Sequence, residues 1–103
     1  MERRLTCADV RRAVATAGIT GPHARAAATR PSPQDSPLIF IVTIPRASAA
    51  YAGLHLAACD PECAAAVAAV AHAERRLSRA LGRPARISEV TQRRSRVALT
   101  VHA

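Results

Sequence analysis

The sequence predicts an α+β domain in which a small antiparallel sheet of three to five strands carries one long amphipathic helix, at about residues 61–81. Three observations support this prediction. The stretch 38–44 (LIFIVTI) is dense in β-branched residues, the stretch 61–81 repeats apolar residues at helical spacing, and the stretch 85–103 contains two segments around a turn. We also expect a helix–loop–helix in the N-terminal part, near one end of the sheet.

The length of 103 residues is enough for a single domain, residues 1–103, because a second independent core would lack material. Within it we expect a helical part at 1–30, a proline-rich loop at 31–37, and the sheet with the long helix at 38–103. The chain has one Phe, one Tyr and no Trp, so its core must be aliphatic. Alanine hides little apolar area, and we therefore expect the protein to gain further burial as a homo-oligomer.

The N-terminal part carries the signals of one helix and weaker signals of a second. Thr6 is placed to cap a helix that runs to Ala17, and Asp9 has a position similar to that of a capping box. Gly18 ends this helix. The alanine-rich stretch 23–30 favours a second helix.

The segment 13–29 loosely resembles a helix-turn-helix, with His23 and Arg25 early in its second helix. Such a resemblance implies contacts with the major groove of DNA. The segment departs from the pattern, because Gly21 and Pro22 open the second helix and no third helix follows. We interpret it as an ordinary helix–loop–helix that covers part of the sheet.

The strand at 38–44 is apolar on both faces, which predicts a central strand covered on both sides. The segment that follows, 46–58, is ambiguous. Its first part (RASAAYAG) suits a helix or a loop, whereas Leu54, Leu56 and Ala58 alternate with a period of two. We predict a strand at 51–58, with a helix as the alternative.

The long helix has clear signals at both ends. Asp60 is a favoured N-cap, Pro61 suits the first helical position, and Glu62 is favourable near the positive end of the helix dipole. Gly82 ends the helix. After it, the chain predicts a closing β-hairpin of the segments 85–93 and 96–103, with its turn near Arg94-Ser95. In the second strand, Val97, Leu99 and Val101 share one face.

At about 100° per residue, the long helix separates into two faces. The apolar face holds Cys63, Ala66, Val67, Val70, Ala73, Leu77 and Leu81. The opposite face holds His72, Arg75, Arg76, Arg79 and Arg83. Such a row of arginines is either a solvated outer surface or a surface that follows phosphates. Glu74 falls on the apolar side, where we expect it either to pair with an arginine of the hairpin or to act as a buried functional carboxylate.

The composition is strongly basic, with a formal net charge of +8 and an isoelectric point of about 11.4. All 15 basic residues are arginine. A bias towards Ala, Arg, Pro and Gly explains part of this charge, but the resulting field attracts polyanions in either case. The predicted nucleic-acid contacts are Arg75, Arg76, Arg79 and Arg83 on the helix and Arg93, Arg94 and Arg96 at the hairpin tip.

The chain has three cysteines, Cys7, Cys59 and Cys63, no apparent secretion signal and no apolar run long enough to span a bilayer. We therefore expect a soluble cytoplasmic protein with reduced thiols and no membrane partner. Cys59 and Cys63, with His55 and His72, suggest a metal site, but His72 lies opposite Cys63 on the helix. We predict no metal, with Cys59 in a turn and Cys63 as a small buried residue.

Enzyme motifs are absent from the sequence, which has no phosphate-binding glycine loop, no G-x-S-x-G and no H-E-x-x-H. We therefore predict no catalysis, no cofactor and no small-molecule substrate. The predicted function is that of a small accessory protein that binds DNA or RNA through an arginine-rich face, largely without regard to base sequence. The alternative is a non-enzymatic, homo-oligomeric interaction module whose basic charge is incidental.

Overall fold

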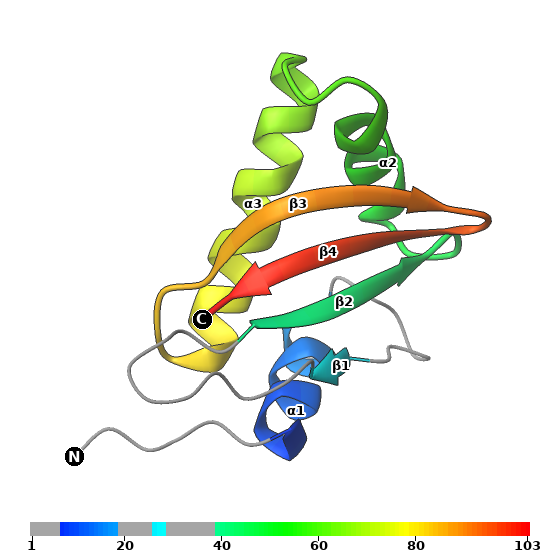
Figure 1. The fold of residues 1–103 in the computed structure, drawn as a ribbon. Helices are drawn as coiled ribbons and strands as arrows, with labels where there is room; N and C mark the ends of the chain where they lie inside the picture. Colours follow the sequence, from blue (N-terminus) through cyan, green and yellow to red (C-terminus); the bar gives the residue numbers. More distant parts are fainter. Residues whose placement is uncertain (1–6, 19–25, 29–38) are drawn as a thin grey trace.

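The computed structural model describes residues 7–18, 26–28 and 39–103 and has two layers (Figure 1). In chain order the elements are α1 (Cys7–Ala17), β1 (Ala26–Ala28), β2 (Ile39–Pro45), α2 (Tyr51–Cys59), α3 (Ala64–Leu81), β3 (Arg86–Arg93) and β4 (Arg96–His102). The strands form one antiparallel sheet, and the three helices lie on one side of it. The predicted α+β fold, with the long helix packed on the sheet, is confirmed.

The sheet has the strand order β1-β2-β4-β3. β3 and β4 form the predicted closing hairpin, with the turn at Arg94 and Ser95. β2 lies inside the sheet, as predicted, between β1 and β4. β1 is short and pairs only with Phe40–Val42 of β2.

In β2, β3 and β4, full burial is confined to the side of the sheet that faces the helices. Phe40, Val42 and Ile44 of β2 are fully buried, whereas Ile39 and Ile41 are half-buried. The cover that we expect on both sides of this strand is therefore complete on one side only. An antiparallel sheet is stable in this arrangement because its second face can be solvated.

One hydrophobic core connects the two layers and is aliphatic apart from Phe40. The helices contribute Val10 and Val14 from α1, Leu54 from α2 and Leu77 from α3, and β4 contributes Val97, Leu99 and Val101. The alternation of β4 thus predicts correctly which of its side chains are buried.

The segment 51–58, for which the alternating leucines predict a strand, forms the helix α2. Its buried residues are Leu54 and Ala57, three positions apart as expected for a helix. Gly53 allows α2 to lie close to α3, since a Cβ atom at this position would be 2.7 Å from the Cβ atom of Ala69. This contact between two helices, which the local pattern does not reveal, favours the helical alternative.

α3 begins at Ala64, later than predicted, because Asp60 is used at the end of α2 instead. The Asp60 N–H donates to the Leu56 carbonyl at 2.7 Å, and the Cys63 N–H donates to the Asp60 carbonyl at 3.2 Å. Cys63 is therefore the N-cap of α3. The predicted end of the helix is confirmed, with Gly82 in the left-handed conformation at a φ of 71°.

α3 is amphipathic, as its spacing predicts. Ala66, Ala73 and Leu77 are buried, whereas His72, Arg75, Arg76 and Arg79 are exposed. Val67 is an exception on the predicted apolar face, since 55% of its surface is exposed. The first turns of α3 extend beyond the sheet and lie beside α2, so the described strands do not cover this position (Figure 1).

The prediction of a second N-terminal helix at 23–30 is wrong for its central residues, because Ala26–Ala28 forms the strand β1. Alanine favours helices over strands, so pairing with the edge of β2 outweighs the local preference at these three residues. This strand contradicts the expected N-terminal helix–loop–helix, and it also departs from the helix-turn-helix that the segment loosely resembles. Several predictions fall outside the described residues. They concern Thr6, the positions 23–25 with His23 and Arg25, the positions 29–30, and the loop 31–37. None of the described helices is long and apolar enough to cross a membrane.

Candidate nucleic-acid interface

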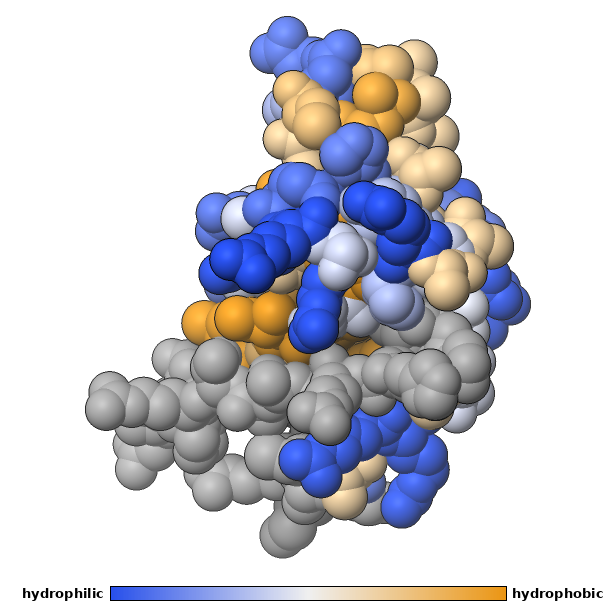
Figure 2. Space-filling model, turned by 90° about the vertical axis from the view of Figure 1, so that its right-hand side faces the viewer, coloured by the Kyte–Doolittle hydropathy of each residue, from blue (hydrophilic) through white to orange (hydrophobic). Residues whose placement is uncertain are grey.

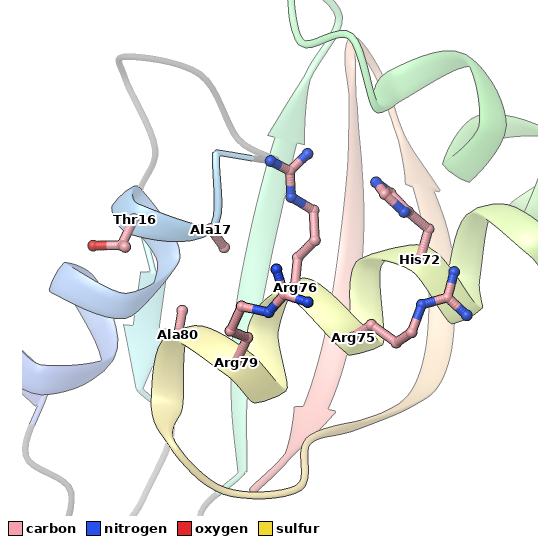
Figure 3. A pocket seen from close by; sticks show the side chains of 7 residues that line it. All are labelled: Thr16, Ala17, His72, Arg75, Arg76, Arg79 and Ala80. Atoms are coloured by element: carbon pink, nitrogen blue, oxygen red, sulfur yellow. The ribbon is translucent and has the colours of Figure 1, made fainter.

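A hollow of about 610 Å³ lies between the C-terminal end of α1 and the exposed face of α3 (Figure 3). We call it the basic groove. It is lined by Thr16, Ala17, His72, Arg75, Arg76, Arg79 and Ala80. Three of these residues are arginines, one is a histidine and none is acidic.

The packing of the two helices creates the basic groove. His72, Arg75, Arg76 and Arg79 lie within two turns of α3, and each has another of the four three or four positions away, so they share one side of the helix. On the opposite face, Ala73 and Leu77 are buried in the core and fix the rotation of the helix about its axis. Val10 and Val14 fix α1 in the same way, and the last turn of α1 forms the second wall. The groove is therefore a consequence of the same contacts that hold the fold.

Arg76 reaches across the basic groove to the end of α1. A Cβ atom on Gly18 would be 3.8 Å from one of its guanidinium nitrogens. Figure 3 shows Arg76 directed towards α1 and Arg75 directed away from it. The last turn of α1 has no basic residue of its own, and the free carbonyl groups there carry partial negative charge. The guanidinium of Arg76 therefore lies beside a helix end at which a positive charge is favourable.

The basic side chains of the groove have no carboxylate partner among the described residues. Glu74, the one acidic residue of α3, accepts a hydrogen bond from the Ile87 N–H at 2.9 Å. Neither expectation for Glu74 is met, because its side chain is half-buried and bonds to the backbone of β3 rather than to an arginine. Like charges at helical spacing repel each other, and a bound anion would offset this repulsion.

The other predicted contacts lie away from the basic groove. Arg83 follows the end of α3 and is half-buried. Arg93 and Arg96 face each other across the hairpin, with Arg94 in the turn between them. β3 carries the chain from near the end of α3 to this tip, a length of roughly 23 Å at about 3.3 Å per residue. The structure thus brings together Arg75, Arg76 and Arg79 and places the hairpin arginines in a separate cluster.

Two residues that belong to these surfaces are not apparent from the sequence. Thr16 lines the groove because α1 packs on α3, a contact that neither helix reveals by itself. Arg46 follows Pro45, which pairs with Arg96, so it belongs with the hairpin arginines. Figure 2, which shows the side of the molecule with the hairpin tip, has strongly hydrophilic residues across the middle and an upper end of apolar residues with a hydrophilic group at its top. We define the hairpin cluster as Arg46, Arg93, Arg94 and Arg96.

A second group of polar side chains lies between α2 and β3. The His55 Nδ1 atom is hydrogen-bonded to the Gln92 Oε1 atom, and the Gln92 Nε2 atom donates to the Tyr51 Oη atom at 3.1 Å. The Cys59 Sγ atom lies 3.9 Å from the His55 Nε2 atom. In a strand, positions four apart would be separated by roughly 13 Å. The strand predicted at 51–58 would therefore keep His55 and Cys59 apart, whereas the helix α2 places them one turn apart and in contact.

The cysteines also differ from their predicted environments. Cys59, expected in a turn, is the exposed last residue of α2, and Cys63, expected to be buried, is half-buried at the N-cap of α3. Both are free thiols. Within the described parts of the chain, no group of three or more His, Cys, Asp or Glu side chains converges to hold a metal ion.

No protein-family model, curated protein or solved structure matches this chain. A functional conclusion therefore depends on the geometry and charge of the basic groove, the hairpin cluster and the polar group on α2.

Proposed function

We propose that the protein binds the phosphate backbone of DNA or RNA through the basic groove, largely without regard to base sequence. One observation carries this proposal. Arg75, Arg76 and Arg79 are exposed, line one hollow together with His72, and have no carboxylate partner among the described residues. A guanidinium group can donate two parallel hydrogen bonds to a phosphate, and each such contact releases counterions from the nucleic acid.

The remaining side chains favour contacts with the backbone over contacts with unpaired bases. Proteins that bind single strands usually stack bases on exposed aromatic rings. The one Phe of the chain, Phe40, is fully buried. The one Tyr, Tyr51, is half-buried and stacked on His55, with 5.5 Å between the ring centroids. Neither ring offers a platform for bases, and we therefore expect a preference for double-stranded nucleic acid.

The hairpin cluster supports a second contact with the same partner. Arg93, Arg94 and Arg96 are exposed. Arg93 and Arg96 are direct cross-strand neighbours, and like charges in such a pair destabilise a sheet. An anion bound between them would offset this cost. A long polyanion can reach both the basic groove and the hairpin cluster, whereas a small phosphate compound can occupy only one of them.

The salt dependence of binding to duplex DNA tests the proposal. Each neutralised phosphate contributes about −0.9 to the slope of log K against log salt concentration. The double substitution Arg76→Gln and Arg79→Gln should therefore make this slope shallower by about 1.8 and weaken binding. Fluorescence anisotropy at several salt concentrations measures both effects, and a parallel series with duplex RNA shows which nucleic acid is preferred.

A matched control is the double substitution Arg11→Gln and Arg86→Gln. Both positions are exposed, neither lines the basic groove, and this variant has the same loss of two positive charges. The control should bind more tightly than the groove variant. Equal effects of the two variants, or no binding of the unaltered protein to DNA or RNA at physiological salt, would contradict the proposal.

The alternative function is self-association without a nucleic-acid partner. It is favoured by the face of the sheet that is turned away from the described helices (Figure 1). On this face Ile39 and Ile41 of β2 and Ala98 of β4 are half-buried apolar residues. A stable dimer in sedimentation velocity, combined with no binding to DNA or RNA, would favour this alternative over the proposal.

A further inference from the structure

The polar group on α2 has the arrangement of a thiol beside a general base. Cys59 and His55 are one helical turn apart, so their side chains meet on one face of α2. The Cys59 side chain is exposed, whereas His55 is half-buried. The ring of Tyr51 stacks on the ring of His55 with an angle of 9° between their planes, which restricts the rotation of the imidazole.

Gln92 determines which nitrogen of His55 carries the hydrogen. The Nε2 group of Gln92 donates to the Tyr51 Oη atom at 3.1 Å and to the Arg93 carbonyl at 2.7 Å. Its Oε1 atom therefore faces the imidazole. Because an amide oxygen can only accept, the Nδ1 atom of the neutral ring is the donor and the Nε2 atom is left as an acceptor. That Nε2 atom is the one that lies 3.9 Å from the Cys59 Sγ atom.

We propose that Cys59 is a nucleophilic thiol, served by His55 as a base, that forms mixed disulfides with small cationic disulfides. The His55 Nε2 atom accepts the proton of the Cys59 thiol. The thiolate attacks one sulfur of R–S–S–R, the bond between the two sulfurs breaks, and a disulfide between Cys59 and one R–S group forms. The other sulfur leaves as a thiolate and takes the proton from His55, which gives R–SH and restores the neutral imidazole.

The surroundings of Cys59 favour a small, positively charged partner. The thiol is exposed at the end of a helix, so a small disulfide can approach it and the leaving thiol can depart. Asp60 and Glu62 follow it and are exposed, and the free carbonyl groups at the end of α2 add partial negative charge. This inference does not depend on the proposed binding of nucleic acid.

The reaction of the intact protein with cystamine tests the inference. Mass spectrometry of the resulting peptides measures the rates at Cys59 and Cys63 side by side. Cys63 is the internal control, because it is also a free thiol but has no histidine partner among the described residues. Cys59 should form the mixed disulfide about ten-fold faster than Cys63, and His55→Ala should remove this advantage. Added imidazole should restore part of the lost rate.

Two further measurements separate a chemical role from a structural one. Gln92 is a positioning residue, so Gln92→Glu, which keeps an oxygen acceptor, should retain the Cys59 rate, and Gln92→Leu should lower it. The anionic disulfide dithiodiglycolate should react with Cys59 more slowly than cystamine does. The inference is overturned if Cys59 reacts no faster than Cys63, if dithiodiglycolate is the faster reagent, or if His55→Ala changes both thiols equally.

Discussion

Gly53 of α2 lies directly against Ala69 of α3, and a Cβ atom at position 53 would be 2.7 Å from the Ala69 Cβ atom. Two carbon atoms at this separation repel each other strongly, since their optimal distance is about 3.5–4.0 Å. Glycine inside a helix usually costs about 1 kcal/mol relative to alanine. The close approach of the two helices therefore matters more at this position than the local preference of α2.

Gly53→Ala should lower the free energy of unfolding by about 1–2 kcal/mol, because overpacking outweighs the gain in helix propensity. Adding Ala69→Gly should return stability close to that of the unaltered protein, since it removes the methyl group that the new Cβ atom meets. Ala68→Gly, at an exposed position of α3, is the control and should give no such recovery. Urea unfolding measures all four proteins, and a stabilised Gly53→Ala variant would show that the contact is looser.

The hydrogen bond between Glu74 and the Ile87 N–H joins α3 to β3. β3 is at the edge of the sheet and has only β4 as its neighbour among the described strands, so the N–H groups on its outer side have no partner in these strands. Glu74 satisfies one of them at 2.9 Å. A hydrogen bond to a charged group contributes about 1.5–3 kcal/mol, more than one between neutral groups. This bond helps to fix the long helix relative to the edge of the sheet.

Glu74→Ala should therefore lower the free energy of unfolding by about 2 kcal/mol, because it leaves the Ile87 N–H without its acceptor. Glu74→Gln keeps an oxygen acceptor and should cost about half as much. Glu62→Ala, at an exposed position, is the control for the loss of one negative charge and should change stability by less than about 0.5 kcal/mol. Thermal and urea unfolding provide the comparison. If Glu74→Ala and Glu62→Ala have equal effects, the hydrogen bond contributes nothing to stability.

The elements that the sequence predicts correctly are those whose signals are local. The end of α3 at Gly82 and the alternation of β4 both depend on neighbouring residues alone. The identity of α2 does not, because Leu54 and Leu56 fit a strand as well as a helix, and the contact with Ala69 decides between them. Because α2 is predicted as a strand, the start of α3 is also predicted too early. Asp60 is assigned as the N-cap of α3, whereas in the structure it ends α2.

The candidate site is predictable to the same extent. Helical spacing predicts that Arg76 and Arg79 share a face, and they do. It cannot predict that the last turn of α1 turns this face into a groove, because that depends on packing between segments distant in sequence. Nor does it show that Arg94 is separated from the helix arginines, which follows from the length and direction of β3.

The distribution of charge over the molecule determines how it would hold a polyanion. The basic groove lies between α1 and α3, and the hairpin cluster lies at the far end of β3, a strand roughly 23 Å long that begins after the end of α3. A short piece of nucleic acid can occupy one of these sites. A longer piece can occupy both, and its second contact is then intramolecular, which raises the apparent affinity without any new interaction.

A longer duplex offers more overlapping positions at which the protein can bind, and this alone raises the apparent affinity. Affinity should therefore rise with duplex length more steeply than this statistical effect predicts. DNA hairpins with stems of about 5 and about 15 base pairs, roughly 17 and 50 Å long at 3.4 Å per pair, compare the two cases at one salt concentration. Substituting Gln at Arg93, Arg94 and Arg96 should weaken binding of the long stem by a larger factor than binding of the short stem, because only the long stem can contact the basic groove and the hairpin cluster together. Substituting Gln at Arg11 and Arg86 instead should weaken both stems by the same factor, since these exposed residues act only through the overall field. If the hairpin variant also weakens both stems equally, the hairpin cluster makes no separate contact, because a bridging contact requires a partner long enough to reach it.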